Sequence, residues 1–520
     1  MRRIRTGLTV VMITIPVLVG GWALRGNLPE SGPRLFAQVL QIVGRDAIDG
    51  ISEDEAYRRA ARGLVEQLGD AYAELYSPEE LATFSREQLG SAYAGMGMQI
   101  EDQQGVVTVT RVFPNTPAER GGVRAGDRIL AVDGQATRDL KLEEVSKRLI
   151  GVAGTTVDIA FSRAGMAEPI RGTYTRAVVH IPAVPYAMVL DGNVGYLPLQ
   201  KFNETSSNDV RDAVRRLQAQ GATSYVLDVR GNGGGSLEEA LMISNLFLKP
   251  GQEISRVEYR NRAPDVYTAR NVTVLPDAPM IVLTDGYSAS ASEIVAGALQ
   301  DHDRALVLGT SSFGKGLVQQ IYTLDGGWAM KLTTGKWFTP AGRSIQRERG
   351  DDGQPIEDDN TEKPVFRSAG GRTIYGGGGI TPDLLIRPDT MHSAEQEFMK
   401  LVGSSWQHVY VAIYDQALAA KDGVAHDFAI EARWRDELYN RLLAADVPIT
   451  RSQYDNARSL IERMLEQRVA SLAFGDSAAF RRFAPHDAQL RTALDLLRQG
   501  HTQNDLFALA DRRNAARKSD

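Results

Sequence analysis

The amino-acid sequence predicts a multidomain α/β protein with an N-terminal membrane helix, a helical segment, a β-rich module, an α/β core and a C-terminal all-α extension. At 520 residues the chain exceeds the size at which one hydrophobic core usually stops growing. Between about Val189 and Ile386, β runs alternate with helical segments, which is typical of an α/β core. From His392 onward the apolar spacing is helical, with little strand pattern.

The composition excludes several classes of protein. Hydrophobic residues make up 43% and charged residues 24% of the chain, which is typical of a folded protein rather than a disordered one. The net charge of −6 argues against a dedicated nucleic-acid-binding protein, so we expect no nucleic-acid partner. The absence of cysteine excludes disulfides, thiolate metal sites and cysteine nucleophiles.

The first 26 residues predict a membrane anchor or a signal peptide. Arg2, Arg3 and Arg5 precede an almost uncharged stretch at residues 7–24, and a helix of that length would span about 27 Å, close to the hydrocarbon core of a bilayer. The basic residues favour a cytoplasmic N-terminus, with everything after Arg25 exported. We favour an uncleaved anchor because no A-x-A-like cleavage site follows. The protein would then lie in the cell envelope, bound to the inner membrane through residues 7–24, with its remaining domains periplasmic or otherwise extracytoplasmic. A buried helix of a soluble protein is the alternative.

Residues 27–90 are expected to be helical, because apolar residues recur at three- and four-residue spacing in AYRRAARGLVEQL. Near the end of this region, Ser77 is expected to cap a helix that has Pro78 in its first turn.

Residues 91–166 are expected to form a compact β-rich module that contains one helix, LEEVSKRLIG. A short glycine-containing loop, Gly95-Met96-Gly97-Met98, opens onto a strand, and such a loop lets backbone N–H groups converge on a carboxylate. The module also contains PNTPA at 114–118 and GVRAGDRILAVDG at 122–134, and in these segments it resembles the PDZ domains of bacterial proteases.

The PDZ resemblance implies that an extended peptide C-terminus pairs with a strand edge of this module. Its carboxylate would lie on the loop Gly95 to Met98, and its apolar side chain would face Met98 and Ile100. The implied peptide-binding residues are therefore Gly95, Met96, Gly97, Met98 and Ile100. The alternative is that these glycines only form turns.

A candidate nucleophile lies where the apolar run MIVLT leads through small residues to a helix that starts near Ser290. At that junction, unpaired N–H groups of the helix N-terminus can stabilise an oxyanion. A serine nucleophile also needs a proton acceptor. His302 lies beyond the end of the same predicted helix, which gives a Ser–His triad little support. Lys315, between two glycines, is the better base.

A lysine acts as a base only when it is neutral. At the ordinary pKa of about 10.4, roughly 0.1% of a lysine is neutral near pH 7.4. Burial can lower that pKa by as much as about 3–5 units, and glycines on both sides of Lys315 allow close packing. Gln319 follows at i+4, one helical turn on, and its amide could orient the amine.

The segments SASASEIVAGALQD and FGKGLVQQ resemble the carboxyl-terminal processing (tail-specific) peptidases, the S41 serine proteases. The other segments that carry this resemblance are LGDAYAELYSPEEL at 68–81, LDVRGNGGGSL at 227–237, KLT at 331–333, FTPAGRSI at 338–345 and GITPD at 379–383. The resemblance spans roughly residues 35–388. It implies a crotonase- or ClpP-like protease core at 167–389, followed by a helical extension at 390–520.

The S41 resemblance also implies site residues. The nucleophile falls on Ser290, the base on Lys315 and its orienting partner on Gln319. The oxyanion would be held by the backbone N–H groups of Ala291 and of a glycine in the 233–235 run, with Gly234 preferred. No metal or cofactor is required, and the expected partners are polypeptide substrates that present their C-terminal tails. Ser288 and Ser292 are the alternative nucleophiles.

The sequence departs from the family pattern in two places. Gly233 stands where the family usually has proline, and Ala71 and Ala73 replace the usual proline and serine. These changes bear on the rigidity of two loops rather than on the chemistry.

Two further classes of protein compete with a peptidase. The segment 309–316, GTSSFGKG, nearly matches the phosphate loop of P-loop NTPases and follows a predicted strand, with a helix expected after it. However, Gly316 lacks the hydroxyl that would bind Mg²⁺. A catalytically inactive PDZ scaffold or chaperone is the non-enzymatic alternative. The C-terminal helices could dimerise the chain or restrain the protease, and the PDZ module could deliver tails or gate the active site.

Overall fold

The computed structural model describes residues 31–86, 90–103, 105–163, 166–275, 277–350 and 363–519. The predicted anchor at residues 7–24 lies outside these ranges. No helix within them is both long enough and apolar enough to cross a membrane. The described residues form two compact units, one made of the residues up to Leu81 together with Gln319–Thr333, the other of Ala82–Val318 and the residues from Thr334 onward.

The first unit contains the helices α2 (Ser31–Asp46) and α3 (Glu53–Glu66), which confirms the helical pattern there. The segment after α3 was expected to be helical, but Glu74–Tyr76 forms the strand β1, which pairs antiparallel with the start of β18 (Ala329–Phe338). The Asp70 carboxylate accepts hydrogen bonds from the N–H and the hydroxyl of Thr333, at 2.9 and 3.0 Å. Pairing with a distant strand therefore overrides the local helical pattern.

The predicted cap at Ser77 is confirmed. The Ser77 hydroxyl accepts the N–H of Glu80 at 3.3 Å, and the Glu80 carboxylate accepts the N–H of Ser77 at 2.8 Å. Pro78 is the first residue of the helix α4 (Pro78–Phe84). This is a capping box, in which two backbone donors at the helix start are satisfied reciprocally.

The β-rich module of the second unit is a six-stranded sheet with the strand order β3-β4-β5-β7-β8 and β6 beside β5. Its elements are β3 (Met98–Gln103), β4 (Val106–Val112), β5 (Arg128–Val132), β6 (Gln135–Ala136), β7 (Thr156–Ser162), β8 (Ile170–Thr175), α5 (Pro117–Arg120) and α6 (Leu142–Leu149). Val109, Ile129, Val145 and Phe161 form its buried core. The sheet continues through β8, past the expected boundary at residue 166. Strand β2 (Ala92–Gly95), which precedes this sheet in the sequence, pairs antiparallel with β9 (Ala177–His180), which follows it.

The α/β core has a six-stranded sheet with the strand order β10-β11-β12-β15-β16-β21, in which only the β10–β11 pair is antiparallel. The strands are β10 (Met188–Leu190), β11 (Val194–Pro198), β12 (Ser224–Asp228), β15 (Met280–Thr284), β16 (Leu306–Gly309) and β21 (Leu384–Leu385). The predicted helices are confirmed as α7 (Ser206–Ala219), α8 (Leu237–Phe247) and α9 (Ala291–Asp301).

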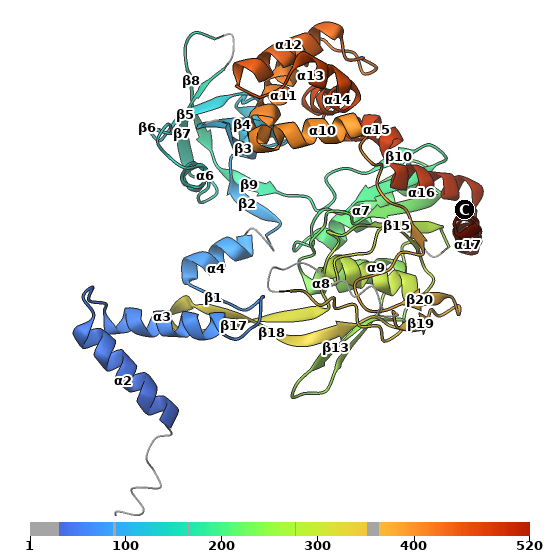
Figure 1. The fold of residues 1–520 in the computed structure, drawn as a ribbon, viewed down its shortest axis with the longest axis horizontal. Helices are drawn as coiled ribbons and strands as arrows, with labels where there is room; N and C mark the ends of the chain where they lie inside the picture. Colours follow the sequence, from blue (N-terminus) through green and yellow to red (C-terminus); the bar gives the residue numbers. More distant parts are fainter. Residues whose placement is uncertain are drawn as a thin grey trace, which may run out of the picture. The chain divides into compact units, whose positions relative to one another are not determined.

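The two faces of this sheet are buried by different parts of the chain. Leu227 and Val282 point into a cluster with residues of α7, α8 and α9. Val226 and Ile281 point into a second cluster with residues of α16 (Ala488–Gln499) and α17 (Gln503–Ser519), which lie against the sheet in Figure 1. Because a parallel sheet needs cover on both faces, the last two helices of the expected extension complete the core.

Most of the remaining C-terminal helices pack around their own apolar cluster, which includes Phe398, Trp434 and Leu465. They are α10 (Ser393–Val402), α11 (Trp406–Ala420), α12 (Ala432–Ala444), α13 (Arg451–Asn456) and α14 (Arg458–Phe474). The helix that follows, α15 (Asp476–Phe483), instead packs Phe480 against the cluster on the second face of the sheet. The all-α prediction is therefore confirmed for the described residues of this region. Tyr414 of α11 donates its hydroxyl to the Val109 carbonyl of β4 at 3.1 Å, so these helices also contact the β-rich module.

The second unit also contains strand pairs outside the two main sheets. Strand β13 (Glu253–Tyr259) pairs with β14 (Asp265–Thr268) and with the end of β18, where Val257 lies opposite Trp337. Strands β19 (Val365–Arg367) and β20 (Thr373–Tyr375) form a hairpin.

Candidate active site

Ser290 lies at the turn between β15 and α9 and is the N-cap of α9. Its φ of 54° and ψ of −110° are rare for a residue with a side chain, and such backbone conformations concentrate at functional sites. The Ser290 carbonyl accepts the N–H groups of Glu293 and Ile294 at 2.9 and 3.0 Å, so the first turn of the helix holds this conformation.

The neighbouring serines differ from Ser290 in exposure. Ser288 and Ser292 are fully buried, and each donates its hydroxyl to a backbone carbonyl, that of Val229 at 2.9 Å and that of Asn232 at 2.8 Å. Ser290 is partly exposed. The structure therefore gives Ser288 and Ser292 structural partners and leaves Ser290 as the serine of this segment that a substrate could reach.

A buried carboxylate, Glu293, joins the serine turn to the lysine loop. Its Oε2 accepts the N–H of Ser290 at 2.8 Å and the N–H of Lys315 at 2.9 Å. Its Oε1 accepts the N–H of Gly314 at 2.7 Å and the hydroxyl of Ser312 at 2.5 Å. Burial raises the pKa of the Glu293 carboxyl, and the hydrogen bonds from Ser312, Lys315, Gly314 and Ser290 offset part of that rise.

Lys315 follows β16 in a loop that permits very close packing. At Gly314, φ is 90° and an added Cβ would lie 2.6 Å from the Arg347 Cβ. The Lys315 carbonyl accepts the indole N–H of Trp337 at 3.0 Å. Lys315 is half-buried between two fully buried glycines. Its backbone is therefore held on both sides, and glycine is required next to it.

Gln319 does not lie on a helix after Lys315, so that prediction was wrong. Residues 317–323 form the strand β17, which pairs with β18, and the helical i, i+4 relationship does not apply. The Gln319 amide donates to the Thr333 hydroxyl at 3.2 Å, within the first unit. A role for Gln319 in orienting the lysine stays a prediction.

The same strand weakens the P-loop alternative. A phosphate loop needs a helix after its lysine, because the helix N-terminus holds the phosphate groups. The described residues that follow Gly316 form β17 instead.

The glycine loop after β12 packs directly on the serine turn. At Gly234, φ is 100° and an added Cβ would lie 3.0 Å from both the Ser290 Cβ and the Ala291 nitrogen. The Gly234 N–H donates to the Asn232 side chain at 2.9 Å, so its use as an oxyanion donor requires that this bond be shared or released. Among the described residues we find no acceptor for the N–H of Ala291, which is the first residue of α9.

Sequence reasoning missed Asn232, a fully buried residue of the same loop. Its carbonyl accepts the N–H of Ala289 at 3.0 Å and the hydroxyl of Ser292 at 2.8 Å. Asn232 therefore forms hydrogen bonds with residues on both sides of Ser290. Its side-chain amide donates to the Leu199 carbonyl at 2.7 Å. In the sequence, the local signal of this role was a single asparagine inside a glycine-rich loop.

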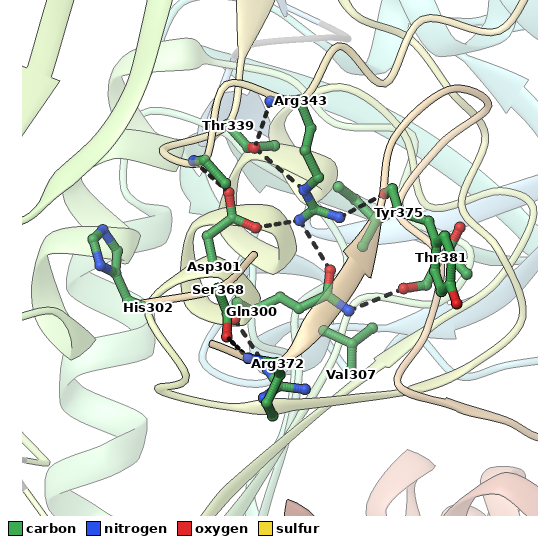
Figure 2. Close-up of polar contacts among 12 residues, drawn as sticks. Gln300, Asp301, His302, Val307, Thr339, Arg343, Ser368, Arg372, Tyr375 and Thr381 are labelled. Carbon is green, nitrogen blue, oxygen red and sulfur yellow. Dashed lines mark hydrogen bonds and ion pairs between the residues drawn. The ribbon is translucent and has the colours of Figure 1, made fainter. Parts of the chain in front are cut away.

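The C-terminal end of α9 is anchored by a network of buried charges (Figure 2). The fully buried Arg343 guanidinium forms an ion pair with Asp301 and donates to the Gln300 side chain at 3.0 Å. It also donates to the Tyr375 carbonyl at 2.9 Å. The Asp301 carboxylate accepts the N–H of Ala341 at 2.8 Å. Both ends of α9 are therefore held, and the position of Ser290 at its N-terminal end is restrained.

Of the predicted peptide-binding residues, Gly95 is the last residue of β2, and Met96, Gly97, Met98 and Ile100 follow it into β3. Met96, Met98 and Ile100 line a cavity of about 750 Å³ whose opposite wall includes Leu142 and Leu149 of α6. In the described sheet β3 pairs with β4 only, which leaves its other edge without a strand. An added Cβ at Gly97 would lie 2.3 Å from the Thr116 Cβ, so the loop requires glycine there.

A model of peptidase family S41 matches residues 193–357, which include both Ser290 and Lys315. The carboxy-terminal-processing protease of Bartonella bacilliformis is 36% identical over 315 residues, covering 60% of this chain and 72% of that protein. The chain belongs to peptidase family S41. Relatives of the chain within this family are named as carboxy-terminal processing proteases.

Further comparisons name other proteins that are similar to this chain. The carboxy-terminal processing protease CtpA of Bacillus subtilis is 32% identical over 296 residues, covering 57% of this S41 chain and 63% of that protein. The chain therefore spans less than two thirds of that relative's length. A solved structure described as the photosystem II D1 C-terminal processing protease shares 29% identity, covers 61% of this chain and 91% of that one, and has a TM-score of 0.35. A PDZ-domain model matches residues 108–163.

Proposed function

We propose that this S41 peptidase is an exported, membrane-anchored endopeptidase that uses Ser290 as its nucleophile and Lys315 as its general base. The observation that carries the proposal is the shared partner of the two residues. One buried oxygen of Glu293 accepts the backbone N–H of both, at 2.8 and 2.9 Å. The serine turn and the lysine loop are therefore held at a common point, as a two-residue catalytic unit requires.

In the proposed reaction, the neutral Lys315 amine accepts the proton of the Ser290 hydroxyl as the oxygen attacks a peptide carbonyl carbon. The developing oxyanion lies at the N-terminus of α9, where the Ala291 N–H and the glycine loop can donate to it. The Lys315 ammonium then protonates the leaving amine, and an acyl-enzyme remains. Lys315 then takes a proton from the water that attacks the acyl carbon. The bond to the Ser290 oxygen breaks, that oxygen takes the proton back from Lys315, and the product acid leaves.

The PDZ module would select substrates by their C-terminal tails. The open edge of β3 can pair with an extended tail, and the cavity between β3 and α6 can hold its apolar side chain. Converging N–H groups of the loop Gly95–Met98 would hold the free carboxylate. We therefore expect polypeptide substrates with apolar C-termini.

The proposed site of action is the cell envelope, with residues 7–24 as the inner-membrane anchor and the protease outside the cytoplasm. The basic N-terminal flank and the uncharged stretch support this proposal. Fractionation of cells and digestion of intact spheroplasts with an added protease test it. Protection of the catalytic domain in intact spheroplasts, or recovery of the chain in the soluble fraction, would contradict it. Homodimer formation through the C-terminal helices is a further expectation, tested by light scattering.

The catalytic proposal is tested with an unfolded protein that carries an apolar C-terminal tail, with the products read by mass spectrometry. Ser290→Ala and Lys315→Ala should each abolish cleavage, whereas the exposed controls Ser477→Ala and Lys336→Ala should cleave as the wild type does. Cleavage retained by either active-site variant would refute the assignment. Inactivity of the wild type towards every tail would favour the non-enzymatic scaffold.

A further inference from the structure

The Arg230 guanidinium connects the glycine loop to a C-terminal helix. Arg230 follows β12 and forms an ion pair with Asp228 at 2.6 Å. It forms a second ion pair with Asp487 at 2.7 Å and donates to the Gln489 side chain at 2.8 Å. The Asp487 side chain is 9% exposed and that of Arg230 is 19% exposed, so both charges are largely removed from water.

The residues after Arg230 lead directly to the nucleophile. The Gly231 N–H donates to the Asp285 carboxylate at 3.1 and 3.2 Å. The next residue, Asn232, accepts hydrogen bonds from Ala289 and Ser292, one on each side of Ser290. Only Gly231 therefore stands between Arg230 and the residue whose carbonyl holds the serine turn.

Asp487 belongs to a part of the chain that the S41 model, which matches residues 193–357, does not include. It is the N-cap of α16, and its carboxylate accepts the N–H groups of Gln489 and Leu490, both at 3.0 Å. Leu490 and Leu496 of α16 are fully buried against the sheet. The carboxylate is therefore fixed both by its own helix and by the packing of that helix on the core.

We propose that Asp487 is a positioning residue of this peptidase, which holds Arg230 and, through it, the glycine loop against Ser290. On this inference the C-terminal helix α16 is part of the catalytic machinery. The inference rests on the proposed function of Ser290. Loss of the Asp487 charge leaves Arg230 paired with Asp228 only, free to shift towards it and to carry the loop along. A loop that donates to the oxyanion acts on the transition state, so the effect falls on kcat rather than on KM.

The test uses the full chain with Asp487→Asn. Asparagine is as good an N-cap as aspartate, so the variant keeps the helix start and removes the charge that faces Arg230. We expect kcat to fall about 10- to 100-fold with KM within about 3-fold of wild type, because a displaced donor should cost less than the roughly 10²- to 10³-fold loss that follows removal of an oxyanion donor. The control is Asp389→Asn, which removes an exposed ion pair to Arg491 of the same helix (3.2 Å) and should leave both constants unchanged.

A kcat of Asp487→Asn within about 2-fold of wild type, or an equal loss in Asp389→Asn, would overturn the inference. Circular dichroism establishes that the variant is folded. If it is not folded, Asp487→Ser, which keeps a capping hydroxyl, takes its place. If both variants are unfolded, Asp487 is needed for folding rather than for positioning Arg230, and the inference is overturned. Ser290→Ala is measured alongside, because activity in that variant would refute the proposed function instead.

Discussion

Ser290 and Lys315 donate their backbone N–H groups to the same oxygen, Oε2 of Glu293, at 2.8 and 2.9 Å. The loops that follow two adjacent parallel strands, β15 and β16, are therefore joined by one buried carboxylate at the first turn of α9. Such a carboxylate sets the distance between the two backbones without taking part in proton transfer. Its removal should disturb the reaction and the local structure together.

Glu293→Gln is expected to lower kcat at least about 10-fold and the free energy of unfolding by about 2 kcal/mol. The amide can replace only one of the two carboxylate oxygens, and its NH₂ group would face backbone donors. Steady-state kinetics and urea unfolding measure the two effects. The control is Glu258→Gln at an exposed position of β13. Wild-type kinetics in a folded Glu293→Gln variant would show that the shared carboxylate is not needed.

Gly234→Ala is expected to reduce kcat about 10-fold or more, because the new Cβ would lie 3.0 Å from the Ser290 Cβ at a φ of 100°. Gly231→Ala is the control that distinguishes the effect of this contact on kcat from the effect of backbone strain. Gly231 also has a positive φ, 69°, but an added Cβ there meets no atom within 4 Å. A smaller loss is therefore expected for Gly231→Ala. Equal losses in the two variants would mean that strain, not the approach to Ser290, explains both.

Asp301→Asn is expected to destabilise the fold by about 3–5 kcal/mol, because it leaves the fully buried Arg343 charge without its carboxylate partner. Asp265→Asn removes an exposed ion pair with Arg262 and should cost at most about 1 kcal/mol. Urea unfolding followed by circular dichroism gives both values. If the two variants are equally stable, the network at the end of α9 does not support the helix.

The stability contributed by Glu395 should depend on pH. Burial raises the pKa of its carboxyl. The Arg463 guanidinium at 2.8 Å and the His392 N–H together lower this pKa by more than burial raises it, so the pKa in the folded protein is below its usual range. A lowered folded-state pKa stabilises the protein above the unfolded-state pKa of about 4.3, and that stability is lost as the pH falls.

Glu395→Gln should therefore lower the free energy of unfolding by about 1–3 kcal/mol near pH 7, and by less as the pH falls below about 4. Urea titrations of wild type and variant across this range measure the difference directly. Glu397→Gln, exposed on the same helix, is the control. A difference that stays constant or grows on acidification would contradict the assigned direction of the pKa shift.

Local patterns in the sequence determined much of this protein. The strand MIVLT and the helix after it were predicted from apolar runs and small residues, and they place Ser290 at a helix N-terminus. The glycines around Lys315 and at 95–98 mark positions where the backbone must approach its neighbours closely. These features depend on residues a few positions apart, which is why the sequence alone could reveal them. The spacing of Ser290 and Glu293 is that of a capping box, a local signal that could have identified Glu293 as well.

Only the tertiary structure decided the rest, because each feature depends on residues far apart in the chain. Residues 317–323 became a strand through pairing with β18, against the expected helix. Ser288 and Ser292 are buried and form hydrogen bonds to the distant β12 loop, and this distinguishes them from Ser290. Asp487 reached Arg230 because α16 covers the second face of the sheet. These contacts depend on how distant segments pack together, and the local propensities of the sequence carry no information about that packing.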